Sequence, residues 1–214
     1  MAVGKAFWED PYRTELATVV AGVRGGDITL ERTIFYAFSG GQEGDTGTIA
    51  GFPVREARKE GREIVYTIEG PHELKAGDAV TVRIDWPRRY SLMRLHFAAE
   101  IVLELMYQKY PGVRKVGAHI SEQKARLDFA WEGNISETFP VIEEGFREIV
   151  SADHAITSAF SDPEDEVRYW EIEGFARVSC GGTHLKRTGE VGAVTLRRNN
   201  IGKGKERVEI TLSA

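Results

Sequence analysis

Alternating apolar and polar side chains predict β-strands through the first 87 residues of the chain. Two stretches rich in β-branched and aromatic residues, 14–23 and 27–36, flank the turn sequence Gly25-Gly26-Asp27, which is typical of a β-hairpin. The alternation returns in residues 63–69 and again in residues 79–86. We therefore expect an all-β region over residues 1–87.

The pattern changes at Trp86-Pro87-Arg88-Arg89, and helical periodicity follows. Ser91 is a suitable N-cap, the helix is expected to run to about Tyr110, and Pro111-Gly112 would end it. Apolar residues occur almost all round this helix, which indicates a buried helix rather than one with an exposed face. The change of pattern predicts a domain boundary, with a second domain over residues 88–214.

The second domain mixes strands and helices. An amphipathic helix is expected at about residues 139–150, and strands are expected at 115–120, 124–131, 169–173, 191–198 and 207–212. Gly202-Lys203-Gly204 would join the last two strands. This pattern predicts an α+β domain without internal repeats.

Composition narrows the class of protein. The 214 residues include 28 Lys and Arg against 33 Asp and Glu, which gives a formal net charge of −5. An acidic chain cannot coat nucleic acid by general attraction to phosphate, so any such contact must be local and no DNA partner is expected. No long apolar run and no leader pattern occur, and the single cysteine excludes an intrachain disulfide. We expect a cytoplasmic protein without membrane contact.

Four residues have the spacing and chemistry of metal ligands. His96 and Glu100 are four apart on the expected buried helix, and Cys180 and His184 are four apart in a glycine-rich turn. Zinc accepts imidazole, thiolate and carboxylate in tetrahedral geometry. Taken singly, each residue is more often a core or ion-paired side chain. Taken together, and because a buried glutamate is costly without a partner, the four favour a zinc site.

A second candidate site lies at residues 33–47, where an expected strand runs into a glycine-rich turn. The alternative is a simple β-turn that binds no ligand. Adjacent glycines at Gly40 and Gly41 would also let backbone amides approach a ligand closely. No Lys-Ser or Lys-Thr pair follows, so the segment does not support a nucleotide-binding P-loop.

Three motifs together resemble a known family. They are Thr33-x-Phe35-Tyr36 with Gly40-Gly41-Gln42-x-x-Asp45-x-Gly47; Leu92-Met93-Arg94-x-His96-x-Ala98; and Cys180-Gly181-Gly182-Thr183-His184-x-x-x-Thr188-Gly189-Glu190-x-Gly192. They resemble the editing domain of alanyl-tRNA synthetase, and more narrowly the free-standing AlaX proteins that carry an N-terminal β domain. The resemblance covers residues 13–198.

The resemblance implies an ATP-independent, zinc-dependent hydrolase that removes serine, and in some members glycine, from mischarged tRNA(Ala). The family usually has His-x-x-x-His on the helix, whereas this chain has Glu100 at the second position. A glutamate ligand adds negative charge and weakens the Lewis acidity of the metal, and Glu100 would be the ligand that yields to a water. In the same family context Thr33 and Gln42, with Gly40 and Gly41, are expected to bind the aminoacyl group.

The expected fold is therefore α+β: a small β-barrel-like domain followed by an editing domain with a buried helix against an antiparallel sheet. The expected enzyme is an aminoacyl-tRNA deacylase. Two alternatives stay open, a non-catalytic tRNA-binding zinc module and a hydrolase for another aminoacyl-tRNA. Four basic residues are candidate contacts to tRNA phosphates, with a solvated surface as the alternative: Arg88, Arg89, Arg197 and Arg198.

Overall fold

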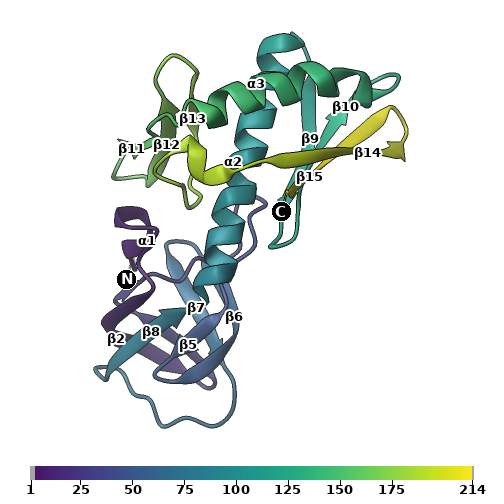
Figure 1. Ribbon diagram of the computed structural model, residues 1–214. Helices are drawn as coiled ribbons and strands as arrows, with labels where there is room; N and C mark the ends of the chain where they lie inside the picture. The colour runs from purple at the N-terminus through teal and green to yellow at the C-terminus, as the bar shows by residue number, and fades with distance from the viewer. Residues whose placement is uncertain (1–2, 214) are drawn as a thin grey trace. The chain divides into compact units, whose positions relative to one another are not determined.

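The computed structural model describes residues 3–213, which divide into two compact units. Unit 1 extends to Tyr90 and unit 2 begins at Ser91 (Figure 1). This division lies three residues beyond the expected boundary at residue 87, inside a helix. The mixture of helices and antiparallel sheets agrees with the expected α+β class.

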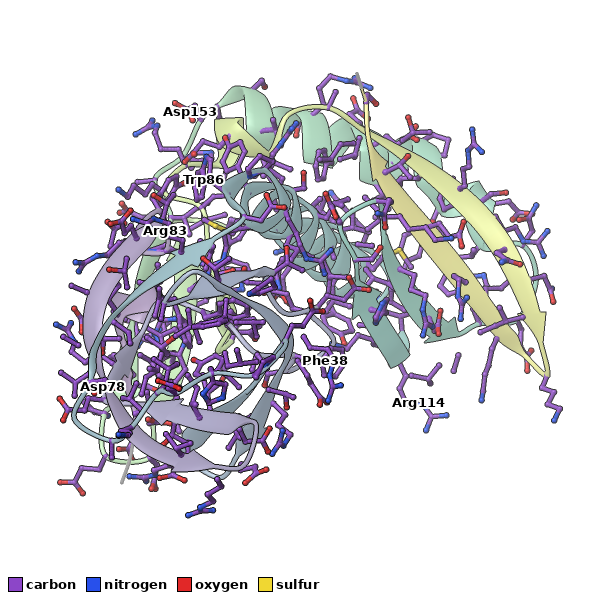
Figure 2. All side chains as sticks on the ribbon, turned by 90° about the horizontal axis from the view of Figure 1, so that it is seen from below. Phe38, Asp78, Arg83, Trp86, Arg114 and Asp153 are labelled. Atoms are coloured by element: carbon purple, nitrogen blue, oxygen red, sulfur yellow. The ribbon has the colours of Figure 1, made fainter. Side chains whose placement is uncertain are left out.

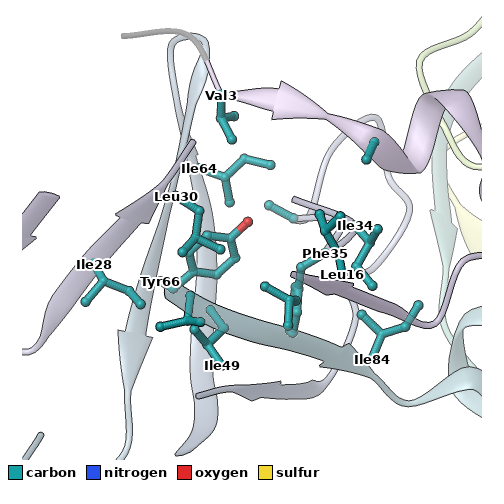
Figure 3. Close-up of a cluster of buried hydrophobic side chains, with 14 of the residues drawn as sticks. Val3, Leu16, Ile28, Leu30, Ile34, Phe35, Ile49, Ile64, Tyr66 and Ile84 are labelled. Carbon is teal, nitrogen blue, oxygen red and sulfur yellow. The ribbon is translucent and has the colours of Figure 1, made fainter. Parts of the chain in front are cut away.

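Unit 1 is built on six strands that pair in a closed ring, in the order β2-β3-β7-β6-β5-β8. The strands are β2 (Glu15–Arg24), β3 (Asp27–Leu30), β5 (Gly47–Ile49), β6 (Phe52–Glu60), β7 (Glu63–Ile68) and β8 (Ala79–Ile84). A short strand β1 (Gly4–Lys5) pairs in parallel with β4 (Arg32–Thr33), and α1 (Ala6–Glu9) follows β1. The ring encloses a core in which Phe35 meets Tyr66 edge-on at 5.6 Å (Figure 3).

The expected hairpin is confirmed as β2 and β3, but its second strand is shorter than predicted. The strand ends at Leu30, and residues 34–37 are extended chain outside any sheet. The Tyr36 N–H donates to the Asp45 carboxylate at 2.6 Å, and the Asp45 N–H donates back to the Tyr36 carbonyl at 2.9 Å. These bonds replace a β-ladder and hold the buried segment in place.

The helix α2 (Trp86–Lys109) begins earlier than the sequence predicts. The Asp85 carboxylate accepts from the Arg88 N–H at 3.3 Å, so Asp85 caps the helix and Ser91 lies inside it. Pro87 is tolerated because the first turn needs no N–H donor there. The prediction that the helix is buried is confirmed, since Leu92, Met93 and Phe97 have no exposed surface.

Unit 2 contains a four-stranded antiparallel sheet in the order β14-β15-β10-β9. The strands are β14 (Val194–Gly202), β15 (Lys205–Leu212), β10 (Ala125–Ala130) and β9 (Arg114–Ile120). The turn between β14 and β15 has positive φ at Lys203 and Gly204, 57° and 67°, the conformation that matches the twist of a two-residue hairpin. Leu127, Val208 and Ile210 are buried on one face of this sheet.

A second antiparallel sheet of unit 2 has the order β11-β12-β13, with β11 (Thr157–Asp162), β12 (Val167–Ile172) and β13 (Ala176–Ser179). Only β12 was expected. Trp170 of β12 meets Phe97 of α2 edge-on at 5.2 Å, which packs the buried helix against this sheet. The remaining elements are η1 (Ile135–Thr138), α3 (Phe139–Ser151) and η2 (Thr188–Val191). Among residues 3–213, no helix combines the length and apolarity needed to span a bilayer.

Candidate metal centre

Three of the four expected metal ligands converge inside unit 2. His96 comes from α2, and Cys180 and His184 come from the loop that follows β13. The Nε2 atoms of His96 and His184 each lie 3.3 Å from the Cys180 Sγ atom. The ligand atoms of all three residues lie within 4.8 Å of one another. The structure therefore brings three of the four expected ligands together, from α2 and from the glycine-rich turn.

The chemistry of this set fits a bound cation. Two ligand atoms of a tetrahedral zinc are roughly 3.5 Å apart, given Zn–N and Zn–S bonds of about 2.0 and 2.3 Å, so the observed 3.3 Å separations are close to those of a zinc site. Hydrogen bonds to sulfur are weak, since Cys180 offers one weak S–H donor to one imidazole and a weak acceptor to the other, and they leave His96 Nδ1 buried without a partner in the described part of the chain. A metal would satisfy all three donors together.

Burial sets the charge of each donor. It lowers the pKa of His96, against a smaller opposite effect of the Glu100 charge, and it lowers the pKa of His184 further, with help from the charges of His96 and Arg168. Both imidazoles are therefore neutral, which is the form that binds a metal. Burial, followed by the Glu100 charge, raises the pKa of the Cys180 thiol to about 12. A cation must displace the thiol proton when it binds.

Hydrogen bonds orient the His184 ring. Its Nδ1 atom lies 2.8 Å from the Ser158 hydroxyl on β11, which leaves Nε2 facing Cys180. Outer partners of this kind fix the tautomer and direction of a metal-binding imidazole. His96 Nδ1 is buried without a hydrogen-bond partner in the described part of the chain. Sequence analysis missed Ser158, because residues 157–162 carry no clear strand alternation.

The loop that carries Cys180 and His184 is held at both ends. The Cys180 N–H donates to the Arg168 carbonyl at 2.8 Å, and the Arg168 side chain donates to the Gly182 carbonyl at 3.3 Å. At the far end, the Glu190 carboxylate accepts from the N–H groups of Lys186 and Arg187 at 3.1 and 3.0 Å. The loop can thus present both ligands from a fixed backbone.

Glu100, the fourth expected ligand, stands beside the set rather than within it. One carboxylate oxygen, Oε1, is 3.8 Å from His96 Nε2, and the other, Oε2, accepts a hydrogen bond of 2.9 Å from the Trp170 indole. The Glu100 side chain is 17% exposed, in contrast to the buried His96. Trp170 was not singled out from sequence, although burial of every second residue of β12 follows from strand alternation.

In unit 1, the expected substrate-binding residues are well ordered by internal bonds. Thr33 has no exposed surface, and its hydroxyl oxygen accepts from the Phe35 N–H at 3.0 Å and from the Tyr66 hydroxyl at 2.7 Å. Gln42 is also buried, and its backbone exchanges two bonds with Ser39. Gly40 and Gly41 occupy the left-handed region, with φ of 60° and 88°, so the tight turn requires them.

The prediction that Arg89 contacts tRNA is wrong. It has no exposed surface, forms a buried ion pair with Asp45, and donates to the Ile34 carbonyl at 2.6 Å. A guanidinium so enclosed cannot reach a phosphate. Arg88 pairs with Glu43 at 2.8 Å and donates to the Gly44 carbonyl at 3.1 Å. Both arginines therefore anchor the glycine-rich segment.

The other two arginines lie on β14. Arg197 is exposed and lies opposite Glu209 in the sheet. Arg198 forms an ion pair of 2.5 Å with the buried Glu206, whose carboxylate also accepts from Asn200 at 2.6 Å. Arg197 is thus available to an external partner, whereas Arg198 is already engaged within the sheet.

The chain thus consists of a closed β unit and an α+β unit whose Cys/His/His set could hold a metal ion. Two family models match, "tRNA synthetases class II (A)" over residues 7–88 and "Threonyl and Alanyl tRNA synthetase second additional domain" over residues 167–209. The first match lies within unit 1 and the second within unit 2.

Full-length relatives give the family. The chain is 35% identical to the alanyl-tRNA editing protein AlaX-M of Pyrococcus horikoshii over 97% of both chains, and 33% identical to AlaX-M of Methanosarcina mazei over 96% of this chain and 95% of the relative. It is also 35% identical to the alanine–tRNA ligase of Ignicoccus hospitalis, of which it covers 25%. The chain belongs to the AlaX-M family of alanyl-tRNA editing proteins, and it is an enzyme of the ester hydrolase (deacylase) class.

Proposed function

We propose that this protein is a zinc-dependent trans-editing hydrolase that removes serine, and glycine as a second substrate, from mischarged tRNA(Ala). The observation that carries the proposal is the convergence of His96, Cys180 and His184 at 3.3 Å in a chain that belongs to the AlaX-M family. The substrate is an activated ester, so the enzyme needs only modest catalytic power.

His96, Cys180 and His184 would hold the zinc, with Ser158 keeping the His184 ring in the metal-binding orientation. Zinc bound there would act as a Lewis acid that polarises the ester carbonyl or a water molecule. The thiolate of Cys180 supplies one negative charge, and Glu100 as fourth ligand would supply the second. The metal and its ligands would then be electrically neutral.

Glu100 is the exchangeable ligand in this proposal. The Trp170 indole holds Oε2 at 2.9 Å, so only Oε1 is left to approach the metal. A carboxylate held by a neighbouring indole can leave the metal without losing all its hydrogen bonds. This arrangement would open a coordination position to the substrate or to water while the two imidazoles and the thiolate stay fixed.

To spare correctly charged alanine, the enzyme must bind the hydroxyl group that only serine has. Alanine is smaller than serine, so it cannot be excluded by size. Thr33 is the candidate for this bond, and its hydroxyl, which is buried in this structure, would have to be uncovered when the aminoacyl group binds. Phe35 and Tyr66 occupy both lone pairs of its oxygen, so its own O–H proton remains to be donated. A serine hydroxyl would accept this bond, whereas alanine would leave the donor unpaired. Gln42, Gly40 and Gly41 of the same unit would be the other contacts of the aminoacyl group.

The recognition of tRNA in this proposal involves exposed Arg197, with Arg198 beside it on β14. Arg88 would act indirectly by fixing the glycine-rich segment. The partner in this proposal is mischarged tRNA(Ala), and the relatives are named alanyl-tRNA editing proteins.

A deacylation assay tests the proposal. Ser-tRNA(Ala), Gly-tRNA(Ala) and Ala-tRNA(Ala) are incubated with the metal-loaded protein, with protein treated with a chelator, and with chelated protein reloaded with zinc. We expect fast loss of serine, slower loss of glycine, little loss of alanine, and activity that returns only with metal. Tight tRNA binding without deacylation would instead identify a binding module. Hydrolysis confined to another aminoacyl-tRNA would identify a different editing substrate.

A further inference from the structure

The four-stranded sheet of unit 2 has two faces of opposite character. In register, Ala125 and Leu127 of β10 lie beside Ile210 and Val208 of β15, and this face is buried. Residues of the intervening positions point to the other face. There Arg126 is opposite both Glu209 of β15 and His119 of β9. The second face is polar across all four strands.

Positive charge dominates this second face. Strand register and the Lys124–Glu209 ion pair of 2.7 Å place six basic side chains on it and two carboxylates, Asp128 and Glu209. The six are Arg114, Lys124, Arg126, Arg197, Lys205 and Arg207. The surplus of four positive charges stands on a chain whose formal net charge is −5. Arg114, Lys124, Arg197 and Lys205 are exposed, and Arg114 extends away from the ribbon in Figure 2.

At the centre of this basic face, hydrogen bonds hold the charged side chains in fixed positions. The Asp128 carboxylate accepts from Arg207 Nε and Nη2 at 2.7 and 3.1 Å and from Arg126 Nη1 at 2.5 Å. Burial raises the pKa of Asp128, but the Arg207 hydrogen bond and the charges of Arg126 and Arg207 outweigh it and lower the pKa below its usual value. A Cβ at Gly117 would lie 3.0 Å from the Asp128 oxygen, so the glycine makes room for the carboxylate.

Asp128 therefore holds two guanidinium groups side by side while using only part of each. Its bonds take two of the five N–H donors of Arg207 and one of the five of Arg126. The side chains of Arg207 and Arg126 are 23% and 32% exposed, so the other donors can reach a partner outside the sheet. Guanidinium groups pair with phosphate in a two-pronged geometry and lose little freedom when they are already fixed.

We propose that this basic face binds the sugar-phosphate backbone of the tRNA substrate. Duplex RNA is recognised largely through its phosphates and shape, which a flat, rigid row of guanidinium and ammonium groups can contact without reading sequence. The surplus charge is concentrated on one face of an otherwise acidic protein, so RNA would be attracted to this face and repelled elsewhere. The proposal rests on the proposed tRNA substrate and assigns where on the enzyme the body of that substrate lies.

Binding of uncharged RNA tests the face independently of catalysis. A fluorescein-labelled tRNA(Ala) transcript is titrated with the full-length protein at several KCl concentrations, and Kd is measured by anisotropy. The variant Arg114→Gln/Arg197→Gln/Lys205→Gln removes three exposed charges and leaves the Asp128 cluster intact. We expect Kd to rise by about tenfold or more at 0.1 M salt, and the salt slope to fall by roughly two to three units. The charge-preserving variant Arg114→Lys/Arg197→Lys/Lys205→Arg should retain the slope.

A matched control neutralises two arginines and one lysine that are exposed elsewhere, Arg24→Gln/Lys59→Gln/Arg147→Gln. An unchanged Kd in the face variant, or equal losses in the face variant and the control, would overturn the proposal. Loss of binding to phosphatidylserine vesicles with RNA binding intact would also overturn it, because a membrane would then be the partner. Hydrolysis separates the two proposals: in an active enzyme the face variant should raise KM for charged tRNA and leave kcat unchanged. RNA binding through the face without any deacylation would contradict the proposed function only.

Discussion

The two units bury polar groups in opposite ways. In unit 1, the Arg89 guanidinium and the Asp45 carboxylate are enclosed together, and the bonds they make hold the chain around residues 34–36. In unit 2, His96, Cys180 and His184 point their ligand atoms at one another, and His96 Nδ1 has no partner in the described part of the chain. Arg89 and Asp45 are a closed pair, because their opposite charges satisfy each other inside the unit. The three residues of unit 2 are an open set, because all three present electron-pair donors, which is the arrangement that binds a cation. Each of the following experiments tests whether this distinction is real.

The largest expected effect is at the open set. Cys180→Ala removes the only anionic member of the three, so we expect zinc content to fall from about one per chain to near zero and deacylation to fall by at least about a hundredfold. Metal analysis and single-turnover deacylation measure this. Ser179→Ala changes the neighbouring exposed residue and should retain metal and activity. Full zinc content in Cys180→Ala would remove the proposed site.

The closed pair should affect stability instead. Arg89→Met leaves the Asp45 carboxylate buried without its partner, so the free energy of unfolding should fall by about 3–5 kcal/mol. Urea denaturation measures the loss, and Arg89→Met combined with Asp45→Asn should recover part of it because no lone charge remains. Zinc content of the folded variant should equal that of the wild type. A loss below about 1 kcal/mol would show that the pair does not hold unit 1 together.

Ser158→Ala tests the orientation of one ligand without removing it. Loss of the hydrogen bond to His184 Nδ1 should weaken zinc affinity by about 10- to 100-fold, as for outer partners of other metal sites. Competition with a chromogenic chelator gives the affinity. Ser161→Ala, on the same strand but bonded to the Val167 carbonyl, is the control. If both variants bind zinc like the wild type, Ser158 does not position the ligand.

Thr33→Val tests whether a bond of unit 1 serves substrate choice as well as folding. The ratio of Ser-tRNA(Ala) to Ala-tRNA(Ala) hydrolysis should fall by about tenfold or more, the value of one hydrogen bond. Tyr66→Phe removes a partner of the Thr33 hydroxyl but keeps that hydroxyl, so this control should retain the ratio. An unchanged ratio in folded, zinc-loaded Thr33→Val would make Thr33 a purely structural residue.

The smallest effect concerns a closed pair within unit 2. The hydrogen bond from Arg198 is the main cause that lowers the pKa of Glu206, so the pair adds stability above the unfolded-state pKa of about 4.3 and loses it as pH falls through the lower folded-state value. Unfolding by urea between pH 6 and pH 3 should show a flatter pH dependence for Glu206→Gln than for the wild type. Arg198→Gln, which removes the main cause of the shift, should also flatten the curve. Equal slopes in all three proteins would contradict the assignment.

Sequence patterns predicted the elements with strong periodicity. The buried helix, the strands β9 and β10, and the β14–β15 hairpin all follow from local signals, namely apolar periodicity or glycine at a turn. The convergence of His96 with Cys180 and His184 was expected from paired four-residue spacings. These features depend on residues that are close in sequence, so one amino-acid sequence is enough to predict them.

The misjudged features depend on distant partners. Arg89 looked like a surface cation because it follows Arg88 at the expected domain boundary. Its burial depends on Asp45, 44 positions earlier, and on the carbonyls of Pro11 and Ile34. The strand predicted at 27–36 ends early because Asp45 takes over the bonds of Tyr36. Ser158 and Trp170 join the centre through tertiary contacts with His184 and Glu100. Pairings across such separations leave no periodic trace in the sequence.

The chain has one cysteine, and it lies at the metal centre. The thiol chemistry of this chain is therefore concentrated at the place where the proposed zinc would bind. A thiolate bound to zinc is shielded from oxidants and alkylating agents, whereas the released thiol would be the sole sulfhydryl of the chain that they could modify. If the proposal holds, the count of reactive sulfhydryls per molecule would run opposite to metal occupancy, from none in zinc-loaded protein to one in metal-free protein. An oxidised Cys180 has no second cysteine in its own chain with which to form a disulfide, so its repair would depend on thiols supplied from outside.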